Sequence, residues 1–184
     1  MLSYVIKDLM AMLPHLLYGG IGALTVAIVL NYCNQKRTKK NQPLIPTLPY
    51  IVLGGYLVML VTITFLSRES GTSGVIDLEL FSSFKINTRN NAYVIENVLL
   101  FIPYGIVIPW AVKWTRRLWK CAFLGMLTSL IIESMQLLTR RGCFQLDDIM
   151  TNWIGSIVGY LLFRIGYAIY NRKGDLGKTM NLKS

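Results

Sequence analysis

Five long apolar runs constrain this chain more than any other feature of its sequence. They cover residues 9–32, 47–66, 93–112, 121–138 and 149–170. A run of about 20 apolar residues is long enough to cross the hydrocarbon core of a bilayer as a helix. Only 15% of the 184 residues are charged, whereas soluble domains carry about 25%. The sequence therefore predicts an all-α integral membrane protein, with about five transmembrane helices in one bundle over residues 1–170 and a tail over residues 171–184.

The net charge of +10 is concentrated in three basic clusters that follow the first, third and fifth runs. These clusters lie at residues 36–40, 113–120 and 172–183. The positive-inside rule assigns them to the cytoplasm. We therefore expect a multi-pass protein of the cell membrane with its N-terminus outside and its C-terminal tail in the cytoplasm. Basic loops near the membrane suit anionic lipids, and this distribution argues against nucleic acid as a partner.

Charged and amide side chains interrupt three of the apolar runs at matching depth. Insertion of such groups into a bilayer core costs about 2.5–3.5 kcal/mol each for the charged ones, so they indicate a functional site. In the expected topology they lie below the outer surface, and helical periodicity places several of them on shared faces. We expect a polar cleft that opens to the outer leaflet. Its candidate ligand-binding residues are Arg68, Asn97, Glu133, Gln136, Arg140, Arg141, Asp147, Asp148 and Asn152, with His15 and Glu96 as further candidates.

Several of these residues also have a purely structural interpretation. Glu133 with its neighbours can fasten helices together, and Asp148 can cap a helix. His15 can be a helix-contact residue, and Glu96, about 100° around its helix from Asn97, can face the interface instead of the cleft. A metal site built from His15, Glu133 and Asp148 lacks diagnostic ligand spacing. We therefore expect neither a metal nor another cofactor.

Two segments outside the runs are harder to assign. Residues 1–13 are apolar at mixed spacing, which suits either an interfacial segment or an extension of the first span. The loop over residues 67–92 contains a segment too apolar for a free loop. We expect it to lie on the membrane or to dip back between helices, where protein covers its backbone.

Three motifs resemble the VanZ-like family in order and spacing. The first is residues 96–105 (Glu-Asn-Val-Leu-Leu-Phe-Ile-Pro-Tyr-Gly), and the second is Glu133-x-x-Gln136. The third is residues 141–148 (Arg-Gly-Cys-Phe-Gln-Leu-Asp-Asp), followed by Asn152, Gly155 and Gly159. The likeness covers roughly residues 67–161. Gln145 stands where the family often has Asp, and Asp77 and Leu80 replace an Asn and a Pro.

The resemblance implies a function outside the cell. The family's named member is associated with resistance to teicoplanin, a lipoglycopeptide that acts on the peptidoglycan precursor. We expect this chain to lower susceptibility to such antibiotics by binding an amphiphile in the cleft: the antibiotic, a lipid-linked peptidoglycan precursor or a lipid head group. The arginines would meet anionic groups, and the carboxylates would meet amines or hold the arginines.

Two other classes of function stay open at this point. The first is a membrane-embedded enzyme that modifies a lipid or cell-wall precursor, with Glu133 or Asp148 as the general acid/base. The second is a lipid transporter or flippase, against which the absence of a paired repeat and the one-sided depth of the polar residues count. The sequence favours binding over catalysis.

Overall fold

Five long helices form the structure, a computed structural model that describes residues 2–66, 75–80 and 88–181. The long helices are α2 (His15–Lys39), α3 (Thr47–Val61), α4 (Thr88–Ala111), α5 (Leu118–Leu138) and α6 (Leu146–Asn181). Each contributes a segment long and apolar enough to cross a membrane, and the segment of α3 runs past the end of that helix to Phe65. The all-α membrane fold predicted from the apolar runs is confirmed.

A proline separates the first transmembrane helix from a short helix before it. Helix α1 (Leu2–Ala11) ends at a turn over residues 12–14, and α2 begins at His15 directly after Pro14. Proline lacks a backbone N–H and disfavours helix in the residue before it. The helix that corresponds to the expected first span, residues 9–32, therefore begins at His15, and it continues to Lys39. Helix α1 is not an extension of that helix but packs on α4.

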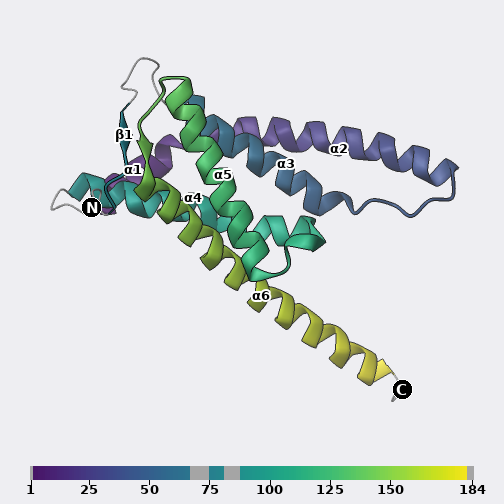
Figure 1. Cartoon of the computed structure of the whole chain (residues 1–184). Helices are drawn as coiled ribbons and strands as arrows, with labels where there is room; N and C mark the ends of the chain where they lie inside the picture. The colour runs from purple at the N-terminus through teal and green to yellow at the C-terminus, as the bar shows by residue number, and fades with distance from the viewer. Residues whose placement is uncertain (1, 67–74, 81–87, 182–184) are drawn as a thin grey trace.

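Helices α2 and α3 form an antiparallel pair that packs through glycines (Figure 1). A Cβ added to Gly55 would lie 2.9 Å from the Gly19 carbonyl oxygen, and one added to Gly22 would lie 2.6 Å from a methyl carbon of Val58. Small residues allow this close approach of two helix backbones. At its end, α3 continues into a π-helical turn, η1 (Thr62–Leu66).

Helices α4 and α6 form the most extensive contact in the bundle, and α5 packs against α6 (Figure 1). Gly105, Gly155 and Gly159 are at this contact: a Cβ on Gly159 would overlap the Ile102 carbonyl oxygen, and one on Gly155 would overlap the Val98 carbonyl oxygen. The glycine face of α6 thus points into the bundle. Beside it lies an apolar core formed by Tyr56, Leu60, Phe101, Tyr104, Ile108 and Ile132.

The two ends of the bundle differ. At one end, which we call the ladder end, β1 (Ile76–Asp77) pairs in parallel with β2 (Phe144–Gln145) between the end of α5 and the start of α6. At the other end, the basic end, a short 3-10 helix η3 (Lys113–Thr115) joins α4 to α5. The basic residues 113–120 lie there, and residues 36–40 end α2 and begin the loop to α3.

Other helix boundaries also differ from the expected spans: α5 begins at Leu118 instead of residue 121, and α6 at Leu146 instead of residue 149. Helix α4 begins at Thr88 instead of residue 93, and α6 continues to Asn181 instead of ending at residue 170. Of the loop over residues 67–92, the described part contributes β1 to the ladder and the first turn of α4. Residues 67–74 and 81–87 lie outside the described residues, so the expected course of this loop stays a prediction.

Candidate functional site

Polar side chains from α4, α5, α6 and the turn after α5 lie at the ladder end, and most of them are buried. We call Asn97, Ser129, Glu133, Gln136, Arg141, Asp148 and Asn152 the polar cluster. Glu133 is 2% exposed, Gln136 1% and Asp148 8%. Their burial matters because a carboxylate or amide removed from water must find hydrogen-bond partners within the protein.

The start of α6 carries the acidic side of the cluster. Asp147 and Asp148 occupy its first turn, where the positive end of the helix dipole stabilises negative charge. The Thr151 hydroxyl donates to the Asp147 backbone oxygen over 2.9 Å. The Asn97 side-chain amide donates to Asp148 Oδ1 over 2.8 Å and so joins α4 to α6. Asp148 therefore links two helices as well as beginning one.

Glu133 and Asn152 join α5 to the next two elements of the chain, β2 and α6. Glu133 Oε2 accepts a hydrogen bond from the Gln145 backbone N–H over 3.0 Å, which fastens β2 to α5. One turn earlier on the same face of α5, the Ser129 hydroxyl oxygen accepts from the Asn152 side-chain amide over 2.8 Å. The shared helix face expected from the sequence thus contacts the face of α6 that carries Asn152.

Gln136 and Arg141 bind the carbonyl end of η1. The Gln136 amide donates to the Thr64 backbone oxygen over 3.1 Å, and Arg141 Nη1 donates to the Phe65 backbone oxygen over 2.9 Å. The last carbonyls of a helix lack donors within the helix, and a cation there is stabilised by the helix dipole. Both side chains therefore cap the helix formed by α3 and η1.

Arg140 occupies the turn that ends α5. Its φ is +52°, in the left-handed region, and its side chain is exposed. The Arg140 N–H donates to the Leu137 carbonyl and the Arg141 N–H to the Gln136 carbonyl. This pair of bonds is a Schellman motif, in which glycine is the usual residue at the left-handed position.

The remaining predicted site residues lie apart from these bonds. His15 begins α2 and packs against Tyr18, with their ring centroids 6.2 Å apart. Glu96 is buried but lines an apolar pocket on another face of α4. Arg68 lies outside the described residues. The structure thus bonds Asn97 to Asp148 and Asn152 to Ser129. At the same end of the bundle, Glu133, Gln136 and Arg141 bond to backbone groups of β2 and η1, and Asp147 is adjacent in the first turn of α6.

Sequence reasoning missed the backbone partners of the cluster. These are the Thr64 and Phe65 carbonyls and the Gln145 N–H. Every residue offers such groups, so no residue type marks them. The one available signal was the expected topology: it places the end of α3 on the same side as the end of α5, so a helix end with free carbonyls was expected near the predicted cluster.

Two acceptor atoms in the cluster suit a ligand that donates hydrogen bonds. Within the described part of the chain, Gln136 Oε1 and Asn152 Oδ1 are buried and have no hydrogen-bond partner. A buried polar atom without a partner costs about 1–3 kcal/mol. An N–H or O–H group of a ligand would remove that cost.

Comparison with known proteins identifies relatives of this chain. The VanZ/LLP1 family model matches residues 53–167, which include the whole polar cluster. The Protein VanZ of Enterococcus faecium is 33% identical over 86 residues, which are 47% of this chain and 53% of that protein. The chain thus matches about half the length of this curated relative. No solved structure matches the chain.

Proposed function

Because the chain belongs to the VanZ/LLP1 family, we propose that it lowers susceptibility to teicoplanin-type lipoglycopeptides. It does so by binding an amphiphile at the polar cluster, in the outer leaflet of the cell membrane. The amphiphile is the antibiotic, a lipid-linked peptidoglycan precursor or a lipid head group. The protein itself is a multi-pass protein of the cell membrane.

This function requires the ladder end to face outward. The basic clusters that follow α2 and α4 support that orientation, because such clusters are typical of cytoplasmic loops. Lys120 lies over Trp114, 4.5 Å from its ring centroid, and over Trp119 at 5.3 Å. Tryptophan and lysine together are typical of a membrane–water interface, and we propose that anionic lipids bind there.

The observation that carries the proposal is the concentration of buried polar groups at one end of an otherwise apolar bundle. Glu133, Gln136, Asp147, Asp148 and Asn152 are all less than 9% exposed. Buried ionic groups are weak contributors to stability compared with apolar residues of similar size. A binding role accounts for their presence better than packing does.

The groups around the cluster suit a ligand with both anionic parts and hydrogen-bond donors. Arg140 is exposed beside the cluster and can meet a phosphate or carboxylate. The free acceptors Gln136 Oε1 and Asn152 Oδ1, free within the described residues, can receive donors of the ligand. Glu133 and Asp148 contribute negative charge to the cluster.

The proposal predicts that Glu133→Gln and Asp148→Asn each abolish protection against teicoplanin while the protein keeps its normal abundance in the membrane. Both substitutions preserve shape and most hydrogen bonds and remove one negative charge. Protection is measured as the inhibitory concentration in a susceptible host that expresses the chain, and abundance is measured by immunoblot of the membrane fraction.

Arg164→Gln is the matched control, because it removes a charge from the same helix about 24 Å from Asp148 and its side chain is exposed. It is expected to leave protection intact. Full protection by both carboxylate variants at normal abundance would instead identify the cluster as a packing device. A fall in abundance that matches the fall in protection would do the same.

The same strains separate binding from catalysis. Mass spectrometry of their lipids and wall precursors is expected to find no covalent product that depends on the chain. A product present with the wild type and absent with Glu133→Gln would replace the binding proposal by an enzyme with Glu133 or Asp148 as general acid/base.

A further inference from the structure

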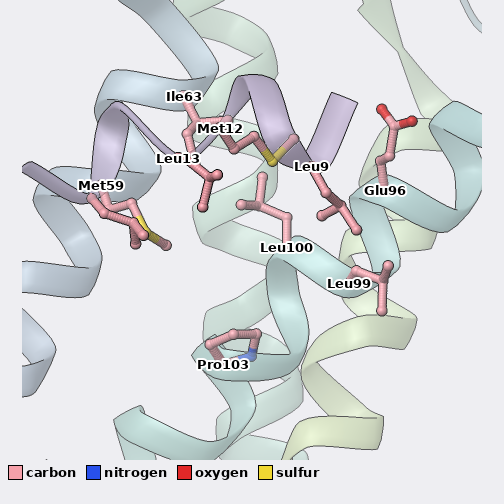
Figure 2. A pocket seen from close by; sticks show the side chains of 10 residues that line it. Leu9, Met12, Leu13, Met59, Ile63, Glu96, Leu99, Leu100 and Pro103 are labelled. Carbon is pink, nitrogen blue, oxygen red and sulfur yellow. The ribbon is translucent and has the colours of Figure 1, made fainter. Parts of the chain in front are cut away.

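An apolar pocket of about 190 Å³ lies beside the polar cluster, on the side where α1 covers α4. Figure 2 shows its lining, with Glu96 toward one end, Pro103 at the other, and leucines from the α1–α2 segment facing leucines of α4. Its lining residues are Leu9, Met12, Leu13, Leu16, Met59, Ile63, Glu96, Leu99, Leu100 and Pro103. Of these ten, Glu96 alone is charged.

The length and volume of the pocket suit one short hydrocarbon chain. Glu96 and Pro103 are seven residues apart on α4, which corresponds to about 10 Å along the helix axis. A volume of 190 Å³ accommodates about six groups of the size of a water molecule or a methylene, at ~30 Å³ each. The lining also includes two methionines, whose flexible side chains adapt to ligands of variable shape.

The pocket and the polar cluster share their walls. On α4, Glu96 lines the pocket while the adjacent Asn97 donates to Asp148 in the cluster. On η1, Ile63 lines the pocket while the Thr64 carbonyl accepts from Gln136. Adjacent residues of the same element therefore face the pocket and the polar cluster in turn. An amphiphile can place its alkyl chain in the pocket and its polar part near the polar cluster.

We propose that this pocket holds a single alkyl chain of a membrane amphiphile whose amine lies beside the Glu96 carboxylate. The inference deepens the proposed function and rests on it, because it names the chemical class of the amphiphile. Contact with the apolar lining is more favourable for the alkyl chain than contact with water. A cation is the complementary partner of a carboxylate, and their attraction is strong where water is scarce.

The test uses purified full-length protein in lipid nanodiscs and two probes of equal length. One is an alkylamine that carries a photoreactive diazirine on its chain, and the other is the fatty acid with the same diazirine. Mass spectrometry of the labelled peptides is expected to place the amine on residues 9–16 and 96–103. The amine should label these segments about fivefold more than the fatty acid does, because only the amine pairs with Glu96.

Two variants assign the parts of the pocket. Glu96→Gln is expected to remove the preference for the amine while the chain still labels the pocket. Leu13→Trp, at a position that is 55% exposed, fills the pocket from its edge and is expected to abolish labelling by both probes. Leu130→Trp, on an exposed position of α5 away from the lining, is the matched control and should label like the wild type.

If a variant does not fold, labelling of the wild-type protein by the two probes still tests the proposal. Equal labelling by the two probes overturns the assignment of an amine, and labelling spread over the exposed apolar residues of α5 and α6 overturns the pocket. Neither result depends on antibiotic protection. The inference can therefore fail while the Glu133 and Asp148 variants still lose protection, and the converse also holds.

Discussion

At the scale of single residues, Arg140 couples the stability of the bundle to its proposed site. A residue other than glycine at a φ of +52° is strained by about 1–2 kcal/mol, because its Cβ approaches the following carbonyl. The adjacent Arg141 is half-buried and bonds to η1, whereas the Arg140 side chain is exposed. Strain of this kind is often found at functional sites, which supports a role for the Arg140 guanidinium in binding.

Arg140→Gly is therefore expected to make the protein more stable and less protective. Glycine relieves the left-handed strain but costs backbone entropy, so the net gain in the free energy of unfolding is about 0.5–1 kcal/mol. Unfolding in mixed micelles measures the gain, and the inhibitory concentration of teicoplanin measures protection. Arg140→Lys, which keeps both the charge and the strained backbone, is the control. Full protection by Arg140→Gly would show that Arg140 serves only to end the helix and does not bind the ligand.

At the scale of elements, the contact between α4 and α6 positions the cluster. Asn97 and Asp148 meet at the ladder end of this contact, and Gly155 and Gly159 lie further along it. A side chain at either glycine would push the two helices apart and lengthen the bond between Asn97 and Asp148. The geometry of the site thus depends on residues that make no polar contact in it.

Gly159→Ala is expected to destabilise the protein by about 1–3 kcal/mol, as overpacking of a filled contact does, and to reduce protection. Its added Cβ would overlap the Ile102 carbonyl oxygen and lie 2.9 Å from the Gly105 Cα. Gly155→Leu, which meets the Val98 carbonyl, should be worse. Thermal unfolding of the purified protein and membrane abundance measure the effect.

Gly166→Ala supplies the matched control on the same helix, because nothing lies within 4 Å of an added Cβ there. It should be neutral or stabilising by up to about 1 kcal/mol, which is the difference in helix propensity. If Gly159→Ala behaved like Gly166→Ala, the close approach of α4 and α6 would not be a constraint on the bundle.

At the scale of the whole molecule, orientation decides which leaflet the polar cluster and the apolar pocket can reach. Five crossings would place the two termini on opposite sides, and the positive-inside rule predicts a cytoplasmic basic end. Both sites lie at the other end, where the ladder of β1 and β2 closes the bundle. A partner of either site would then come from the outer leaflet or from outside the cell.

Cysteine labelling of intact cells tests this orientation. A membrane-impermeant maleimide is expected to modify Cys143, which is half-buried beside β2, and to leave Cys33 on α2 unmodified until the cells are opened. Buried Cys121 should stay unmodified in the folded protein. A Ser184→Cys variant extends the test to the tail. Its labelling from outside would reverse the topology and place the cluster in the cytoplasmic leaflet.

The sequence by itself determined the class of fold, the number of long helices and most of the polar cluster. The length and hydropathy of the runs are enough to predict the helices, because an apolar run of about 20 residues that crosses a bilayer must be helical to satisfy its backbone hydrogen bonds. The cost of burying polar groups in a bilayer is enough to predict the cluster, because polar side chains at the same depth on three apolar helices are expected to face one another and not the lipid. On that basis the sequence predicted Asn97, Asp148 and Asn152, and Asn97 bonds to Asp148 while Asn152 bonds to Ser129. Glu133 and Gln136 were predicted in the same way and bond to backbone groups at the same end of the bundle. Their role in binding a ligand stays a prediction.

Only the tertiary structure decided which partners these residues have and which face each occupies. The bonds from Gln136 and Arg141 end on backbone carbonyls of η1, and periodicity carries no information on backbone partners. Glu96 and Asn97 are adjacent in sequence, yet one lines an apolar pocket and the other binds Asp148. That separation depends on the packing of α1, α3 and α6 around α4, which is a property of side-chain shape and not of hydropathy.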